Sequence, residues 1–319
     1  MTAPMTAPMI SVVVLGYSQF DRTTGPCLES LKPWLKQPDF EFIVFDNASP
    51  DGSGDKTRAW CLQHPTVRFF QSSENLGYAG GMNAAAAHAQ GRWLLLVNND
   101  TEFPSHTLDA LLGVLRQAPA NLAMVGPVTN AAGNGQRLYD PDKSRVQWLE
   151  MGAWLNAHPT GQLLPTYRCD FFCIAIRQDA WQALGGLDPV FGRGYYEDFD
   201  FSLRLRQAGY EQAITEDVFI YHQGSATFGN DPSLKALIKT NKRIMQKRHP
   251  GLRFLHVREC NLDALVAAQK QTPGPIQNLP QALQQRQQLR WQGIRLDQPR
   301  SPLKRSLWRF RLWRTLGHV

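Results

Sequence analysis

The chain has 319 residues, of which 43% are apolar, with 34 lysines and arginines against 27 aspartates and glutamates. This length and this apolar fraction exclude a largely disordered chain and predict a sizeable buried core, in one large domain or two small ones. No apolar run in the sequence reaches the roughly 20 residues that a membrane-spanning helix needs.

The net charge of +7 is concentrated at one end of the chain. Residues 285–319 hold nine basic side chains and one acid, so the rest of the chain carries a net charge of −1. The charge therefore indicates a basic tail rather than a protein that binds polyanions over its whole surface.

The N-terminus and the cysteines indicate the cellular setting. The segment MTAPMTAPM has neither the basic region nor the long apolar stretch of a signal peptide, and residues 1–9 are expected to be disordered. Five cysteines at irregular spacing argue against a disulfide framework, and Cys169 and Cys173 are expected to be buried thiols rather than zinc ligands. A cytoplasmic location is the expectation.

Short β-rich segments alternate with helical segments in the first half of the chain. The segments that predict strands are Ile10–Leu15, Glu41–Phe45, Val67–Gln71, Trp93–Val97 and Leu122–Val128. The segments that predict helices are Cys27–Leu35, Asp55–Gln63, Gly80–Ala89 and Ser105–Gln117. Strands that are apolar throughout, such as VVVL and WLLLV, predict an α/β fold with a parallel sheet covered on both faces.

The second half is less regular. Residues 129–165, rich in Gly, Asn and Pro, predict a long loop or subdomain near the site, and from about Gln269 the Gln, Pro and Arg composition predicts an end to compact folding. Between them we expect a buried strand, a helix, a last strand and a basic helix, at Cys169–Arg177, Glu197 to about Gly209, Val218–His222 and Ser233–Arg248.

Polar turn residues follow the second predicted strand, in the segment DNASPDGS that begins at Asp46. In parallel sheets, ligands bind outside the carboxyl ends of the strands, where an acid can accept a hydrogen bond from a nucleotide base. The same residue types also form turns for purely local reasons. The sequence leaves both interpretations of Asp46 open.

The fourth predicted strand ends in Asn98-Asn99-Asp100. Asp100 emerges where Mg²⁺ can lie between one carboxylate and substrate phosphates, and a polar cap on the strand end is the alternative. In the preceding segment ENLGYAGGMN, Gly80 and Gly81 are expected to open a helix whose N-terminus favours anions. The segment matches neither the P-loop nor the dinucleotide-binding fingerprint.

Three acids begin a predicted helix in Glu197-Asp198-Phe199-Asp200. The helix dipole alone favours acids at this position, and Asp200 forms an ordinary pair with Arg204 one turn later. The alternative is that one acid faces a cleft as a general base. The segment FGRGYY before the helix contains more aromatics and glycines than a simple cap requires, which favours the second interpretation.

The ordered segments together resemble one known family. VVVLGY, DNASPDGS, ENLGYAGGMN, LLLVNNDT and GGLDPVFGRGYYEDFDFSLRLRQAGY follow one another as in the inverting family-2 glycosyltransferases of GT-A fold, and resemble most the bacterial rhamnosyltransferase-like branch that builds O-antigen and other surface polysaccharides. The resemblance covers about residues 10–250. It implies a Rossmann-like domain with a mostly parallel central sheet flanked by helices, and leaves residues 251–319 as a C-terminal extension.

The same resemblance implies roles for individual residues. Asp198 corresponds to the catalytic base, with Glu197 beside it. Asp100 and His222 correspond to residues that hold a divalent cation, Mg²⁺ or Mn²⁺, near the diphosphate of the donor, although a lone strand-end histidine more often has a structural role. The residues that correspond to the nucleotide-sugar contacts are Tyr17, Asp46, Asn75, Gly77 and Asn99.

Two positions depart from the pattern of the family. Ser18 stands where an Asn usually follows the first-strand Tyr, and Asn98 replaces the first acid of the D-x-D metal motif. Asp100 is therefore expected to hold the metal almost alone, so that the cation arrives largely with the nucleotide sugar.

The resemblance implies transfer of a sugar from a nucleoside-diphosphate sugar to a hydroxyl of a glycan or lipid-linked glycan, with inversion. The replaced acid at Asn98 motivates an alternative, a non-catalytic module that binds a nucleotide sugar or a glycan. A third hypothesis, a sugar-nucleotide pyrophosphorylase, lacks its Gly-rich basic loop after the first strand.

The tail SPLKRSLWRFRLWRTLG has a poor amphipathic period. Leu303, Leu307 and Phe310 share one helical face, Trp308 lies on another, and Arg314 intrudes on the first. Alternating Trp, Phe and Arg nevertheless suit a lipid headgroup interface, so peripheral contact with the inner face of the cytoplasmic membrane is one expectation. A solvated or partner-docking tail is the alternative. Nucleic acid is not an expected partner, because no recognised binding module accompanies the tail.

Overall fold

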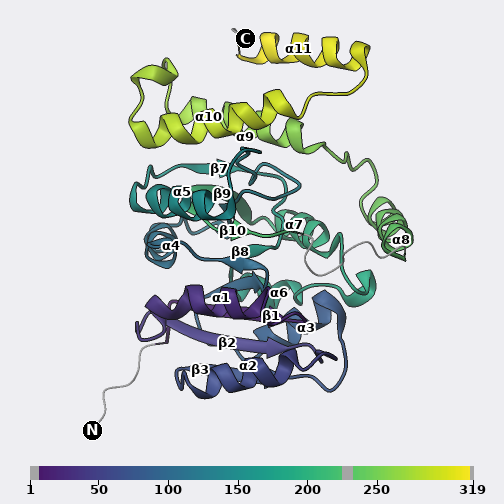
Figure 1. The fold of residues 1–319 in the computed structure, drawn as a ribbon. Coiled ribbons are helices and arrows are strands. Elements are labelled where there is room, and N and C mark those ends of the chain that lie inside the picture. Colours follow the sequence, from purple (N-terminus) through teal and green to yellow (C-terminus); the bar gives the residue numbers. More distant parts are fainter. Residues whose placement is uncertain (1–6, 225–232, 317–319) are drawn as a thin grey trace.

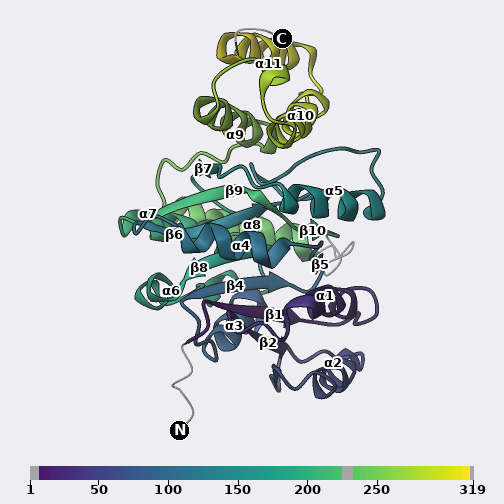
Figure 2. The same ribbon diagram turned by 90° about the vertical axis from the view of Figure 1, so that its left-hand side faces the viewer.

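The structure is a computed structural model that describes residues 7–224 and 233–316. Its centre is an eight-stranded mixed sheet with helices on both faces (Figures 1 and 2). In their order across the sheet, the strands are β3 (Val67–Gln71), β2 (Phe40–Asp46), β1 (Ile10–Gly16), β4 (Trp93–Asn98), β8 (Cys173–Arg177), β6 (Leu122–Val128), β9 (Glu211–Phe219) and β7 (Leu163–Pro165). Strands β8 and β7 run antiparallel to their neighbours and the other pairs are parallel, which confirms the predicted α/β class.

Continuous apolar sequence explains the middle of the sheet. Every residue of β1 is buried; Val12 and Val14 pack against one helical layer, and Val13 and Leu15 pack against the other. The first layer contains α1 (Thr24–Leu31), α2 (Ser53–Leu62) and α4 (Thr107–Arg116). The second contains α3 (Gly77–Ala86), α6 (Gln178–Leu184) and α7 (Glu197–Gln207).

Helix α3 begins earlier than the sequence predicts. Its first residue is Gly77, so Gly80 and Gly81 lie within the helix and do not open it, contrary to expectation. A Cβ atom on Gly81 would lie 2.9 Å from Leu15 Cδ1, so this glycine allows the helix to pack closely on β1.

The segment predicted as a long loop or subdomain contains regular structure. Helix α5 (Arg145–Ala157) begins with a capping box between Ser144 and Gln147, and β7 follows it. The S-x-x-Q pattern that caps α5 is visible in the sequence and could have revealed the helix. The last long strand, β9, also begins earlier than expected. The prediction missed its first half because that half contains polar residues, such as Gln212 and Thr215, which are buried in the structure.

Short elements complete the chain around the sheet. A two-stranded sheet pairs β5 (Thr101–Glu102) with β10 (Tyr221–His222). Helix α8 (Ser233–Arg248) packs through Met245 against the 3₁₀ helix η2 and the start of α7. The 3₁₀ helices are η1 (Lys32–Trp34), η2 (Pro189–Phe191) and η3 (Ile276–Asn278).

The C-terminal region corrects a prediction, because compact folding does not end near Gln269. Helices α9 (Val257–Gln271) and α10 (Gln281–Leu296) pack on each other at the β7 edge, and α11 (Pro302–Leu316) forms the outermost element (Figures 1 and 2). Arg286 and Arg290, expected in a tail, are 1% and 0% exposed. The composition misled because buried polar side chains, together with the apolar Leu289, dock α10 on the sheet.

The sequence also led to expectations for the N-terminal segment and for the cysteines. Residues 1–6 of the segment expected to be disordered lie outside the described residues, whereas the carbonyls of Pro8 and Met9 accept hydrogen bonds from the backbone of Arg92 and Trp93. All five cysteines are buried and free, as predicted for Cys169 and Cys173. Among the described residues, no helix combines the length and the apolar character that crossing a membrane requires.

Candidate active site

A cleft of about 730 Å³ opens where β4 ends. Its walls come from the loops after β4 and β6, the segment before β8, the start of α7, and β10. Four residues predicted for the site line this cleft, namely Asp100, His222, Glu197 and Asp198. The topology explains why they meet: β8 runs antiparallel to β4, so its first residues lie at the edge where β4 finishes.

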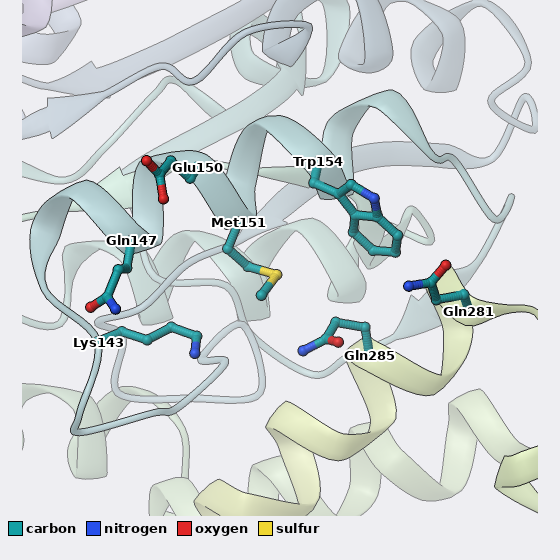
Figure 3. A pocket seen from close by; sticks show the side chains of 7 residues that line it. All are labelled: Lys143, Gln147, Glu150, Met151, Trp154, Gln281 and Gln285. Carbon is teal, nitrogen blue, oxygen red and sulfur yellow. The ribbon is translucent and has the colours of Figure 1, made fainter.

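A second hollow, of about 400 Å³, lies between α5 and α10 (Figure 3). Trp154 and Met151 lie among polar side chains there, and Glu150 is its one carboxylate among the described lining residues. It shares no described lining residue with the cleft and contains none of the predicted site residues. The cleft is therefore the candidate active site.

Asp100 and His222 form one wall of the cleft. The Nε2 atom of His222 lies 3.3 Å from Asp100 Oδ1, and its Nδ1 lies 2.7 Å from the carbonyl oxygen of Ala131. Burial lowers the pKa of His222, but the hydrogen bond and charge of Asp100, with the Ala131 carbonyl, outweigh it and raise the pKa above its usual value. Both neighbours are acceptors, so both ring nitrogens donate only in the protonated imidazolium.

Asn98 lies beside this pair with an unused acceptor. It lines the cleft, and its Oδ1 atom is buried without a hydrogen-bond partner in the described structure. In residues 7–224 and 233–316, no three His, Cys, Asp or Glu side chains gather into a metal site. The donors present are thus one carboxylate, one amide oxygen and one imidazole, a set that suits a hard or borderline divalent cation whose remaining ligands come from substrate.

Glu197 and Asp198 line the same cleft from the first turn of α7. Glu197 is buried and its Oε2 has no hydrogen-bond partner among the described residues, while Asp198 Oδ1 accepts from the Phe199 backbone at 2.7 Å. Burial and the neighbouring Asp198 charge raise the pKa of Glu197. Burial and the charge of Asp170 raise the pKa of Asp198, against the opposing effect of Arg168.

The loop before these acids has a strained backbone that α8 holds in place. Tyr195 and Tyr196 have φ angles of 70° and 81°, values that favour glycine. Asn241 of α8 is 1% exposed, and its Nδ2 donates to the carbonyls of Phe191, Gly194 and Tyr195 at 2.8, 2.9 and 3.0 Å. This buried amide fixes the path of the chain into α7.

Arg168 and Asp170 are cleft residues that sequence reasoning missed. The guanidinium of Arg168 donates to the Gly133 carbonyl at 2.7 Å and lies 5.1 Å from the ring centre of Phe199. Asp170 accepts from the Gly133 backbone N–H. The rule that ligands lie at the carboxyl ends of strands did not point to them, because they precede the antiparallel strand β8.

The expected nucleotide residues lie at the ends of neighbouring strands. Asp46, the last residue of β2, is buried, and its Oδ2 accepts from Ser49 N and from Gln71 Nε2, both at 3.1 Å. A Cβ atom on Gly54 would lie 2.8 Å from this oxygen. The local turn chemistry that was one interpretation of Asp46 is therefore present.

Asn75 and Gly77 connect the strand end that carries Asp46 to the loop before α7. Asn75 Oδ1 accepts from Gly77 N at 2.9 Å and from Asn47 Nδ2 at 3.2 Å. Gly77 has a φ of +71°, and a Cβ atom there would lie 2.4 Å from the Gly192 carbonyl oxygen. The glycine thus allows two loops to touch beside the acids of α7.

Tyr17 and Asn99 differ in where they lie. Tyr17 follows β1 and is half-buried, next to the strand end that carries Asp46. Asn99 is buried, and its Nδ2 donates to the hydroxyls of Thr23 and Thr24 at 3.1 and 2.9 Å. Within the N-N-D segment, Asn98 and Asp100 line the cleft, whereas Asn99 bonds the start of α1.

Known proteins resemble this chain in sequence and in fold. An uncharacterized protein of Mycobacterium tuberculosis is 28% identical over 71% of this chain and 78% of its own length. An N-acetylglucosaminyl-diphospho-decaprenol L-rhamnosyltransferase of the same species is 25% identical over 76% of this chain and 86% of its own length. A mannosyltransferase of Pyrobaculum calidifontis, solved with GDP-Man and Mn²⁺, has a TM-score of 0.50 at 16% identity, over 98% of this chain and 76% of its own.

The sequence profile of glycosyl transferase family 2 matches residues 11–182, more than half of the chain. The match spans the strands from β1 to β8 and ends before Glu197, Asp198 and His222. The fold likeness agrees with the GT-A architecture, and the chain belongs to glycosyl transferase family 2.

Proposed function

We propose that this glycosyltransferase transfers a sugar from a nucleoside-diphosphate sugar to a hydroxyl of a glycan or lipid-linked glycan, with inversion at the anomeric carbon. One observation carries the proposal: a single cleft is lined both by the pair Asp100 and His222 and by the pair Glu197 and Asp198. The first pair suits a divalent cation that binds the diphosphate of a donor, and the second pair can accept the proton of an attacking hydroxyl.

The donor nucleotide would lie along the ends of β1, β2 and β4. The residues proposed to contact or position the nucleotide remain Tyr17, Asp46, Asn75, Gly77 and Asn99. Tyr17 offers a half-buried ring, and the Asp46 carboxylate has lone pairs beyond the local bonds it accepts. Asn99 would act by fixing the strand end rather than by direct contact, since its amide already bonds Thr23 and Thr24.

Asp100, His222 and Asn98 are the residues that would hold a divalent cation, Mg²⁺ or Mn²⁺. The orphaned Asn98 Oδ1 and the Asp100–His222 contact support this fit. When bound, such a cation neutralises charge that develops on the leaving diphosphate. His222 would hold the cation through an unprotonated Nε2, with its Nδ1–H donated to the Ala131 carbonyl.

Asp198 is the proposed base. It would accept the acceptor hydroxyl's proton as the oxygen bonds the anomeric carbon and the diphosphate leaves from the opposite face. A base works best when its pKa lies near the operating pH, and burial raises the pKa of Asp198 in that direction. Glu197 beside it keeps the pair from ionising fully, because two neighbouring carboxylates repel.

The rhamnosyltransferase relative suggests the acceptor class. Its name specifies a sugar-diphospho-polyprenol acceptor and an L-rhamnosyl donor. We extend this to a hexosyl- or rhamnosyl-type transfer in the synthesis of O-antigen or another surface polysaccharide, at the inner face of the cytoplasmic membrane. A polyprenol-linked acceptor would require the protein to work at the surface of a lipid bilayer.

A panel of UDP-, dTDP- and GDP-sugars with Mg²⁺ or Mn²⁺ tests the proposal. Release of nucleoside diphosphate that depends on an added acceptor is the expected result, with a product of inverted anomeric configuration by NMR. The alternative of a non-catalytic binding module, favoured by Asn98 in place of an acid, predicts calorimetric donor binding without turnover. Donor binding with no product from any donor–acceptor pair would contradict the proposal.

A further inference from the structure

Helix α11 carries two apolar faces. Trp308 and Leu312 are 5% and 1% exposed and pack against Leu262 and Leu265 of α9. The centre of the second face lies about 175° around the helix from the first, at 3.6 residues per turn. It consists of Leu303, Leu307, Phe310 and Trp313, which we call the α11 stripe.

The α11 stripe is open to solvent. Leu303, Leu307, Phe310 and Trp313 are 72%, 62%, 59% and 59% exposed, and the rings of Phe310 and Trp313 lie 5.9 Å apart. Elsewhere in the described structure, large exposed apolar side chains are more scattered, such as Leu62. Exposed apolar side chains gathered on one helical face are typical of a binding surface rather than of an ordinary solvated helix.

Basic side chains flank the stripe, and Arg314 lies on the same face as Leu303 and Leu307. Helix α11 contains no acid, and its basic residues are Lys304, Arg305, Arg309, Arg311 and Arg314. Arg311 pairs with Glu259 at 2.8 Å on the side of α9. Within the described residues, no ion pair occupies Lys304, Arg309 or Arg314, and all three are exposed. Their charge is therefore available to an anionic surface.

We propose that the α11 stripe inserts into the interface of an anionic lipid leaflet. Apolar and aromatic side chains flanked by Lys and Arg, on a helix that lies flat, are the properties of interfacial helices. Figures 1 and 2 show α11 as the outermost element, and its other face is docked on the body, so the stripe can meet a plane. A second copy of the chain fits less well, because it would bring uncompensated basic residues together.

This inference rests on the proposed function and deepens it. The α11 stripe would hold the enzyme where a lipid-linked acceptor lies. The two ideas fail separately. Vesicle binding without sugar transfer by any donor would leave the surface assigned and overturn the enzyme. Transfer to a water-soluble acceptor without vesicle binding would support the enzyme and overturn the lipid-binding surface.

Flotation of the full chain with vesicles tests the surface. We expect binding to phosphatidylcholine vesicles that contain phosphatidylglycerol, weak binding to phosphatidylcholine alone, and a loss of binding as salt rises. Each basic residue near an anionic leaflet contributes about fivefold to partitioning, so Arg309→Gln/Arg314→Gln should weaken binding about 25-fold. Phe310→Ala/Trp313→Ala should weaken it by more than about tenfold.

Matched controls lie at the far end of the molecule. Leu62→Ala removes an equally exposed leucine from α2, and Lys36→Gln removes an exposed charge; both should leave vesicle binding unchanged. Circular dichroism should find every variant folded, because each altered side chain is exposed. Binding that is absent in the wild type, or unchanged in both double variants, would overturn the proposal. So would light scattering that finds a dimer which Phe310→Ala/Trp313→Ala dissociates.

Discussion

The sheet and the C-terminal helices are built from different interactions. In the sheet, apolar strands such as β1 and β4 bury side chains on both faces. At the β7 edge, Arg290 Nε bonds the carboxylate of Glu216 at 2.6 Å, and Arg286 donates to the carbonyls of Glu216 and Leu155 at 2.6 and 2.8 Å. Apolar packing tolerates many exchanges of side chain, whereas a buried ion pair fails when one partner is lost.

The two regions also differ in what they offer to other molecules. The sheet holds a cleft lined by acids, and the C-terminal helices present an apolar and basic surface without acids on α11. The two proposals therefore assign chemistry and location to separate parts of one chain. The predictions below test this division, and each variant should affect one region and spare the other.

Replacement of Asp100, the acid proposed to hold the cation, should have the largest effect on the transfer rate. Asp100→Ala should lower kcat/KM by about 10²–10⁴-fold, because a cation that stabilises a leaving group contributes several kcal/mol. Steady-state rates over a Mn²⁺ titration measure it. Glu150→Ala is the matched control, since it removes a carboxylate from the other hollow (Figure 3). A normal rate in Asp100→Ala, or an equal loss in Glu150→Ala, would place the chemistry elsewhere.

Loss of the buried arginine should separate stability from chemistry. Arg290→Met should lower the free energy of unfolding by about 3–5 kcal/mol, because Glu216 stays buried without its partner. Chemical denaturation measures it. Arg309→Met, an exposed arginine on α11, should change stability by less than about 0.5 kcal/mol. Equal effects of the two substitutions would mean that α10 is not held to the sheet by charge.

Asn241→Asp should lower the rate and the stability together, because an aspartate buried against three carbonyl oxygens has no partner for its charge. Asn241→Asp keeps the shape of the side chain but has no amide protons for the three carbonyls of the loop before α7. We expect kcat to fall about tenfold with little change in KM, because misplaced acids lose transition-state contacts. The exposed neighbour Lys239→Gln should leave both constants unchanged. A rise in KM alone would assign Asn241 to donor binding instead.

The two acids of α7 should make stability depend on pH. The folded-state pKa values of Glu197 and Asp198 lie above their unfolded values, so the native state holds more protons, and this contribution is fully present below about pH 4 and declines as pH rises. The slope is at most about 1.4 kcal/mol per pH unit for each proton. Unfolding of wild type and Glu197→Gln/Asp198→Asn from acid to neutral pH checks it. Parallel profiles would exclude the raised pKa values.

Much of the sheet could be predicted, because β1, β2, β3, β4 and β6 are short apolar segments bounded by turn residues. Two features could not. The antiparallel strand β8 brought Arg168 and Asp170 into the cleft, which a parallel-sheet rule does not foresee. Arg286 and Arg290 occur in a Gln-rich segment typical of a tail, and their burial depends on Glu216, which lies far away in the sequence.

Within the site, the sequence located segments better than single side chains. It identified the segment that ends β4 and the start of α7 as functional, and both line the cleft. It assigned Asn99 to the nucleotide, although the side chain bonds Thr23 and Thr24, and it treated Asn98 only as a missing acid. Neighbouring residues at a strand end face opposite ways, and the sequence alone does not determine which one faces the ligand.

The central claim is that Asp198 accepts a proton in a sugar transfer. The most direct measurement compares wild type and Asp198→Asn for transfer rate at saturating donor, with donor affinity measured by calorimetry on the same samples. The account predicts a fall in rate of about 10²–10⁴-fold with donor affinity preserved. Transfer by Asp198→Asn at the wild-type rate would contradict it.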